Sequence, residues 1–241
     1  MTNLAPIVPN AADEPVSFVS RDGWRLEGVL RLPSGSGHGP DQAGRGAVLV
    51  HGSHHERDTF VYGIALPDVL AEHGIASLRF DIRGRGASRS PRSWRELTTL
   101  ERRAVADDVA VASDLLRQRA DIGDGHLAVV GEQDTSRAVV AAVESDPHIG
   151  AMVLLSPRLG RSSAQGLRAR AVPTCAMVSK EDRRSLSDAV DAFLAGPADR
   201  SELHVFAGLG FGTTMFMARA FQHPDEPPLE VMIAAWLARA L

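Results

Sequence analysis

Two short polar segments hold the side chains best suited to chemistry. Residues 53–58 read Ser-His-His-Glu-Arg-Asp, so two adjacent imidazoles, His54 and His55, follow a strongly apolar run. Histidine titrates near neutral pH, and either side chain could act as a general acid or base. Residues 132–134 read Glu-Gln-Asp after a second apolar run. The amide of Gln133 could bind a carbonyl group while a neighbouring carboxylate or imidazole moves a proton, with no covalent intermediate.

Each segment also has a structural interpretation. A solvated polar loop would explain His54 and His55, and the carboxylates of Glu132 and Asp134 would complement the dipole of a helix that begins there. We expect no metal ion and no cofactor, because adjacent histidines in a loop seldom turn toward one ion. The ligands of such a metal site would be His51, His54, His55 and Asp58.

Strands and helices alternate along the chain and position these segments. Apolar and β-branched runs predict strands at 16–19, 24–32, 47–50, 75–80, 127–130, 151–155, 172–178 and 203–206. Apolar residues at helical spacing predict helices at 66–73, 101–119, 136–144, 186–194 and 229–241. Most strands are apolar throughout, which is typical of a mostly parallel sheet with helices on both faces. Ligands bind such a sheet at the carboxyl ends of its strands, where both polar segments lie.

Smaller signals complete the predicted organisation. Asp22-Gly23 between the first two strands indicates a hairpin, and residues 33–46 are rich in Gly, Ser and Pro, as a loop would be. Thr98 or Thr99 can cap the long helix. We expect residues 1–15 to form an extended lead-in and residues 16–241 to form a single domain.

Composition limits the classes of function. The chain has 241 residues, enough for one α/β domain, and a net charge of −4 with no block of like charges, which disfavours nucleic-acid binding. No run of 18 apolar residues occurs, so we expect no membrane span. Cys175 is the one cysteine, so no internal disulfide can form. We therefore expect a cytoplasmic protein with a small-molecule substrate or ligand, and keep a homodimer as an option.

Five motifs in order resemble the α/β-hydrolase superfamily, especially its capless dienelactone-hydrolase and esterase-like members. The family pattern has a strand followed by His-Gly, then Phe-Asp-x-Arg-Gly-x-Gly-x-Ser, a Gly-x-Ser-x-Gly turn around the nucleophile, an acid loop and a Gly-x-Gly-His-Gly loop. The matching segments here are 48–52, 80–88, 131–135, 178–182 and 206–212. The resemblance covers residue 16 to the C-terminus and implies an α/β-hydrolase fold.

The chain departs from this pattern at the residues that carry the family's chemistry. Gln133 stands at the serine position, and an amide cannot serve as a nucleophile. Thr135 replaces the glycine that follows the nucleophile in the family. Phe211 stands at the histidine position, where a phenyl ring cannot move a proton. Asp182 falls at the acid position, and without a histidine to orient we expect it to cap the following helix.

Other positions have roles implied by the same resemblance. The backbone N–H near Ser53 belongs to the site that holds a carbonyl oxygen, and His51, Asp81 and Arg83 brace loops. Phe211 and Met215 could line an apolar pocket for a substrate, although core packing explains them equally.

One linker bears on access to that pocket. Residues 158–171 are too few for a large lid domain, so the pocket is open or closed by a partner. The four arginines in this linker could attract an anionic substrate, but we favour solvation of a short helix.

Two hypotheses from different classes follow. The leading one is an enzyme that acts on an ester-, thioester- or lactone-like carbonyl compound without a Ser-His-Asp triad, as a hydrolase, lyase or cyclase. Its candidate catalytic residues are Glu132, Gln133, Asp134, His54, His55 and Asp182. The alternative is a catalytically inactive relative that binds a ligand or a partner protein. A conventional esterase with Asp134 as a shifted nucleophile is a weaker third option.

Overall fold

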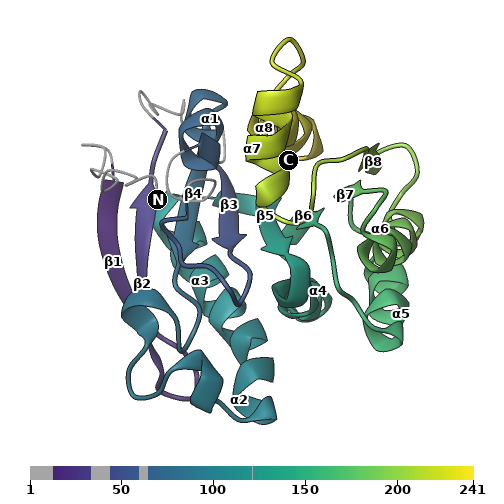
Figure 1. The fold of residues 1–241 in the computed structure, drawn as a ribbon. Helices are drawn as coiled ribbons and strands as arrows, with labels where there is room; N and C mark the ends of the chain where they lie inside the picture. Colours follow the sequence, from purple (N-terminus) through teal and green to yellow (C-terminus); the bar gives the residue numbers. More distant parts are fainter. Residues whose placement is uncertain (1–12, 34–43, 60–64, 121) are drawn as a thin grey trace.

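The computed structural model describes residues 13–33, 44–59, 65–120 and 122–241. Within this part of the chain one eight-stranded sheet has the order β1-β2-β4-β3-β5-β6-β7-β8 (Figure 1). The strands are β1 (Asp13–Val19), β2 (Arg25–Arg31), β3 (Gly44–Val50), β4 (Ile75–Phe80), β5 (Ile122–Glu132), β6 (Ile149–Leu155), β7 (Thr174–Ser179) and β8 (Glu202–Phe206). The pairs β1–β2 and β2–β4 are antiparallel, and all others are parallel.

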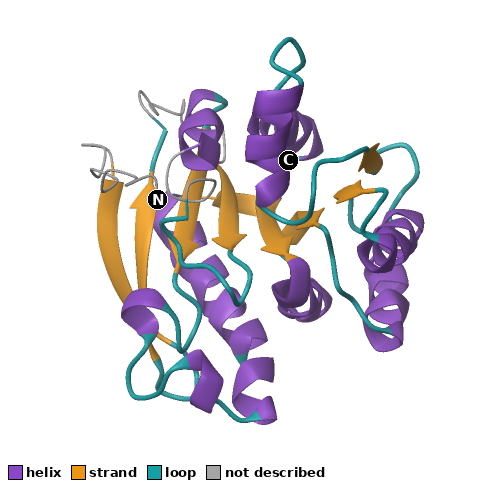
Figure 2. Cartoon of the chain, viewed as in Figure 1, coloured by secondary structure: helices purple, strands orange, loops and turns teal. Residues whose placement is uncertain are grey.

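Helices cover both faces of the sheet, as Figure 2 shows. They are α1 (Leu66–Glu72), α2 (Thr99–Arg103), α3 (Val105–Ala120), α4 (Ser136–Ser145), α5 (Arg161–Arg170), α6 (Arg183–Ala195), α7 (Thr214–Gln222) and α8 (Leu229–Ala240). Short 3₁₀ turns are η2 (Gly86–Ser88), η3 (Trp94–Glu96) and η4 (Gln133–Thr135). The predicted fold class, a mostly parallel sheet between two helical layers, is confirmed.

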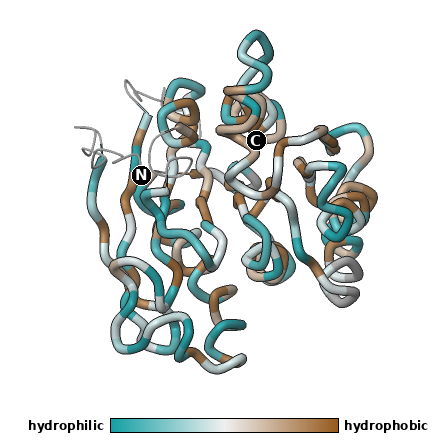
Figure 3. Tube along the Cα trace, viewed as in Figure 1, coloured by the Kyte–Doolittle hydropathy of each residue, from teal (hydrophilic) through white to brown (hydrophobic). Residues whose placement is uncertain are grey.

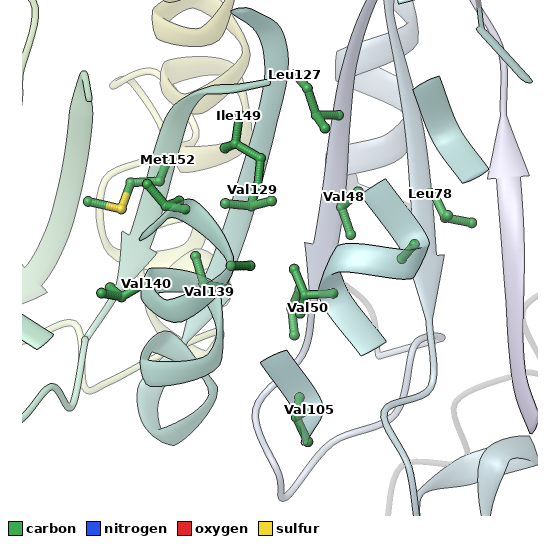
Figure 4. Close-up of a cluster of buried hydrophobic side chains, with 14 of the residues drawn as sticks. Val48, Val50, Leu78, Val105, Leu127, Val129, Val139, Val140, Ile149 and Met152 are labelled. Carbon is green, nitrogen blue, oxygen red and sulfur yellow. The ribbon is translucent and has the colours of Figure 1, made fainter. Parts of the chain in front are cut away.

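Alternate strand residues supply two separate cores. Val48 and Val50 of β3 face the layer that contains α3 and α4, and Figure 4 shows them in this cluster with Val129 of β5. Ala47 and Leu49 face the opposite layer, where α1 and α8 pack. Strand residues alternate between the faces of a sheet, so a strand buried on both sides must be apolar throughout. In Figure 3 the loop between β4 and α2 is largely hydrophilic by contrast.

Several element boundaries differ from those predicted. Strand β1 begins at Asp13, inside the predicted lead-in, and β3 begins at Gly44, inside the predicted loop. The long predicted helix is divided at Ala104 into α2 and α3, with the side chain of Thr98 accepting a hydrogen bond from the backbone N–H of Glu101. Most of the predicted loop and lead-in lies outside the described residues.

The hairpin, the loop-bracing residues and the membrane prediction can also be compared with the structure. Gly23, at φ +87°, lies in the turn between β1 and β2, where its backbone N–H donates to Ser20. Arg83 is fully buried and donates hydrogen bonds to Asp108 through Nε (2.8 Å) and Nη2 (2.6 Å), a structural role as expected.

Within the described ranges, no helix combines the length and the apolarity that a bilayer crossing needs.

Candidate active site

A buried carboxylate at the end of β5 joins two loops at the carboxyl edge of the sheet. Glu132 is the last residue of β5 and its side chain is fully buried. Its Oε2 accepts hydrogen bonds from the backbone N–H of Gly52 (3.0 Å) and from Nδ1 of His55 (3.1 Å). Its Oε1 accepts one from the backbone N–H of Thr213 (2.8 Å). The donors belong to the loops after β3 and β8, so Glu132 fixes these loops relative to β5.

Glu132 and His55 favour each other's charged form. Burial alone would raise the pKa of Glu132, but the hydrogen bond and charge of His55, with two backbone N–H groups, hold that pKa below its ordinary value. The hydrogen bond to Glu132 raises the pKa of His55 above its ordinary value despite partial burial. The His55 side chain is 29% exposed. Since Nδ1 is engaged by Glu132, Nε2 is the ring nitrogen left for another molecule.

Gln133 occupies the turn between β5 and α4 in a strained conformation. Its φ is +45°, in the left-handed region that non-glycine residues rarely adopt, and it is 7% exposed. A Cβ placed on Gly212 would lie 2.8 Å from Gln133 Nε2 and 2.2 Å from Glu132 Oε1. The amide, the carboxylate and the loop after β8 therefore meet at one point.

Asp134 engages the backbone N–H for which the sequence implied a carbonyl-binding role. The N–H of Ser53 donates to Asp134 Oδ1 over 3.1 Å, and Ser53 itself is buried. Two consecutive residues of the loop after β3 thus both donate to carboxylates near the end of β5, Gly52 to Glu132 and Ser53 to Asp134. A substrate oxygen that used the Ser53 N–H would have to displace Asp134.

The loop after β8 keeps a defined shape around Phe211. Gly208, Gly210 and Gly212 all have positive φ, as only glycine does without strain. Side chains at the ends of other strands accept backbone hydrogen bonds from this loop: Glu181 from Gly208 (2.9 Å), Ser179 from Leu209 (3.1 Å) and Ser156 from Gly212 (2.8 Å). The Phe211 side chain is 51% exposed. The loop therefore presents an exposed phenyl ring and does not line a closed pocket with it.

Sequence reasoning did not identify Ser156 and Thr213 as part of this site. Ser156 follows β6, is fully buried and has φ +45°. Its Oγ accepts from Gly212, and its carbonyl accepts from Ser185 Oγ over 3.1 Å. The sequence could have indicated Ser156 by its position alone, because it is the first polar residue after the apolar strand β6. Thr213 contributes a backbone N–H, which no sequence pattern distinguishes.

The other predicted residues lie apart from this cluster or have structural roles. His54 is exposed and is not brought to Glu132. His51 is fully buried, with Nδ1 2.8 Å from the Gly52 carbonyl and Nε2 accepting from the N–H of Ile82. Burial lowers the pKa of His51, so its ring stays neutral and braces the loop, as expected.

Asp182 and Met215 lie in a helix cap and in the core, respectively. Asp182 Oδ1 accepts from the N–H of Ser185, so the predicted helix cap is confirmed. Its Oδ2 is buried and has no hydrogen-bond partner among the described residues. Met215 is fully buried in the core beside α8, which agrees with the core-packing explanation that the sequence left open, and its role in substrate binding stays a prediction. Residues 214–222 form α7, which was not predicted, and Met215 packs inward from that helix.

Comparisons with known proteins identify the architecture. No family model matches the chain. The uncharacterized protein YfhR of Salmonella typhimurium is 29% identical over 133 residues, which span 55% of this chain and 41% of that protein. The structure is similar to dienelactone hydrolase from Anabaena variabilis (TM-score 0.74, 18% identity, 95% of this chain and 98% of that one). It is also similar to Pyrococcus furiosus esterase Pf2001 (TM-score 0.71, 12% identity, 100% and 95%). The chain therefore has the α/β-hydrolase fold.

Proposed function

We propose that the protein is an enzyme that hydrolyses a small ester, thioester or lactone by general acid–base catalysis, with His55 as the base. The observation that carries this proposal is the 3.1 Å contact between Glu132 and His55 Nδ1. A buried carboxylate that holds one imidazole nitrogen leaves the other free to exchange a proton, as the acid and histidine of a hydrolytic triad do. The esterase and dienelactone hydrolase activities in the names of similar structures favour a carbonyl substrate.

The proposed reaction uses water as the nucleophile. His55 Nε2 takes a proton from a water molecule while the water oxygen attacks the substrate carbonyl carbon. Gln133 Nε2 donates a hydrogen bond to the carbonyl oxygen as negative charge develops on it. The bond to the leaving oxygen or sulfur then breaks, and the imidazolium returns the proton to that atom. Water and substrate are consumed, and an acid and an alcohol or thiol form.

A covalent route has little support. Gln133 and Phe211 occupy the positions that the resemblance assigns to the nucleophile and the histidine, and neither side chain can do those jobs. Among the described residues Asp182 Oδ2 has no hydrogen-bond partner, as expected of a triad acid whose histidine has been replaced. Asp134, the alternative nucleophile, already accepts from the Ser53 N–H.

A non-catalytic role is the second candidate, and one observation favours it. Asp134 occupies the Ser53 N–H, the donor that a substrate carbonyl would need, so the site is partly filled by the protein's own side chain. A protein that only binds a ligand or a partner would tolerate this arrangement. Under this candidate, Glu132 holds the loops after β3 and β8 to the end of β5, and His55 neutralises the charge of Glu132.

The adjacent histidines provide a matched experiment. Hydrolysis of p-nitrophenyl acetate, acetyl-CoA and dihydrocoumarin should be measured for the wild type, His55→Gln and His54→Gln. We expect His55→Gln to lower kcat/KM by about 100-fold, the scale of general-base catalysis, and His54→Gln to leave it within about twofold. The wild-type rate should rise with pH through the raised pKa of His55, because the neutral imidazole is the base.

The outcomes separate the candidates. Equal rates for His55→Gln and the wild type would exclude His55 as the base. A stable covalent adduct on Asp134, detected by mass spectrometry after incubation with ester, would instead establish the nucleophilic route. No turnover of any of the three probes above the uncatalysed rate would favour the binding role.

A further inference from the structure

A second feature lies beside the turn that contains Gln133. A cavity of about 550 Å³ opens between η3, the adjoining helices α2 and α3, and the first turn of α4. Its polar wall includes Arg102, Arg103, Arg137, Thr135 and Asp134, and the ring of Trp94 forms part of another side. Small apolar residues of α3 and α4 complete the lining. The volume is within the range that holds a metabolite-sized ligand.

Three guanidinium groups in this wall have no acidic partner in the described part of the chain. Arg102 donates to the carbonyls of Trp94 (3.1 Å) and Arg95 (3.3 Å). Arg137 donates to the carbonyls of Arg158 (3.0 Å) and Leu159 (3.3 Å). These acceptors are neutral, so they orient the side chains without cancelling their charge. Arg103 makes no hydrogen bond or ion pair with any described residue.

The carboxylates near the cavity in sequence are already used. Residues 85–103 contain six arginines and two glutamates in a chain whose net charge is −4. Glu96 accepts from the N–H of Ser93 (2.8 Å) and Glu101 from the N–H of Thr98 (2.8 Å), both as helix caps. Overall composition is acidic, so this local excess of positive charge is not a consequence of composition.

Arg85, whose guanidinium lies over the Trp94 ring, is a further positive charge that forms no ion pair with any described residue. Its guanidinium carbon is 5.9 Å from the centroid of the Trp94 ring, and its Nε is buried with no hydrogen-bond partner among the described residues. Burial and the charges of Arg89 and Arg95 lower the pKa of Arg85. A buried donor without an acceptor is costly. Arg85 does not line the cavity, but its charge adds to the positive potential beside Trp94.

We propose that this cavity binds a small organic anion, with Arg102, Arg103 and Arg137 as contacts for a phosphate or carboxylate group and Trp94 against its less polar part. Arginine is suited to this because its planar fork donates two parallel hydrogen bonds to either group. The carboxylate of Asp134 repels the anionic end, which therefore binds at the arginines. The proposal does not depend on catalysis by His55.

Direct binding tests the proposal. Isothermal titration at low ionic strength should be performed with pyrophosphate, citrate and, as the uncharged probe, glycerol. The variants are Arg103→Gln, Arg137→Gln and Arg168→Gln; Arg168 is an exposed arginine of α5 outside the cavity. We expect saturable binding of pyrophosphate or citrate, weakened about tenfold by either cavity substitution and unchanged by Arg168→Gln. The stronger of the two anions identifies phosphate or carboxylate as the preferred group.

Fluorescence locates the bound anion independently. Of the three tryptophans, Trp24 and Trp236 are buried, so an anion in the cavity should change the emission of Trp94. This change should disappear in Trp94→Phe and persist in His55→Gln, which separates it from failure of the catalytic proposal. Absence of binding by the wild type, equal weakening in Arg168→Gln, or glycerol binding as tightly as the anions would overturn the proposal.

Discussion

The carboxylate of Glu132 and the imidazole of His55 form an ion pair at the carboxyl edge of the sheet, with 3.1 Å between Oε2 and Nδ1. Eighty backbone positions separate Glu132 from Gly52, whose N–H shares the same Oε2 atom. The pair therefore has two roles. It joins loops from distant parts of the chain, and it raises the pKa of the His55 imidazole.

Stability should depend on pH through this pair. His55 has a raised pKa when folded, so its contribution is complete below its ordinary value of 6.5 and is lost as pH rises through the raised value. Glu132 has a lowered pKa, so its contribution is present above its ordinary value of 4.5 and is lost as pH falls through the lowered value. The ion pair should therefore stabilise the fold most between the two ordinary pKa values, 4.5 for Glu132 and 6.5 for His55.

Urea denaturation of His55→Gln and the wild type checks this at about pH 6 and about pH 9. The difference in unfolding free energy should be larger at the lower pH. The same comparison for His54→Gln should show no pH dependence. A difference for His55→Gln that stays constant between the two pH values would mean that the ion pair does not form in solution.

Removing the Glu132 carboxylate should destabilise the protein strongly. Glu132→Ala leaves the buried N–H groups of Gly52 and Thr213 without acceptors, at about 1–3 kcal/mol each. Glu56→Ala, at an exposed neighbouring position, should cost less than about 0.5 kcal/mol. Chemical denaturation measures both values. Similar losses for the two variants would show that water replaces the carboxylate without cost.

Two glycines of the loop after β8 allow backbone strain to be separated from crowding. Gly208 (φ +72°) and Gly212 (φ +55°) both need the left-handed region, which costs alanine about 1–2 kcal/mol. An alanine Cβ at Gly208 would meet its nearest atom at 3.7 Å, but at Gly212 it would lie 2.2 Å from Glu132 Oε1. Gly212→Ala should therefore lower the melting temperature more than Gly208→Ala, and it should also lower the pKa of His55 by displacing Glu132. Equal melting temperatures would contradict this packing.

Replacing Gln133 by glycine should remove the backbone strain at this position and should also reduce the proposed hydrolytic activity. Gln133→Gly and Ala171→Gly each replace a residue at positive φ, +45° and +48°, and each should stabilise the fold by about 0.5–1 kcal/mol. Ala171 ends α5 and lies outside the site, so only Gln133→Gly should also reduce turnover of the ester probes. A destabilised Gln133→Gly beside a stabilised Ala171→Gly would show that the Gln133 side chain supports the turn.

Particular residues show how far the sequence alone could lead. Uniformly apolar runs predicted the sheet because strands buried on both faces have few other options. The choice between His54 and His55 was not predictable, because it depends on the turn in which the N–H of His55 donates to the Gly52 carbonyl. Helix α7 was not predicted, because core packing and a substrate pocket explained Met215 equally well in the sequence; in the structure Met215 packs in the core from this helix.

The arginine cavity could not have been predicted for a different reason. Trp94, Arg103 and Arg137 lie in three segments, and their proximity depends on how α2, α3 and α4 pack. Long-range packing of this kind leaves no periodic pattern in a single sequence.

The two carboxylates that flank Gln133 also limit what substitutions at the site could achieve. Placing a serine at 133 and a histidine at 211 would not by itself recreate a triad enzyme, because Asp134 and Glu132 would still occupy the N–H groups of Ser53 and Gly52. Removing either carboxylate alone leaves a backbone N–H without its acceptor, and the N–H of Gly52 is buried. Each carboxylate is therefore tied to the backbone donor that it occupies, and the identity of residues 132 and 134 limits which side chains positions 133 and 211 can use for chemistry.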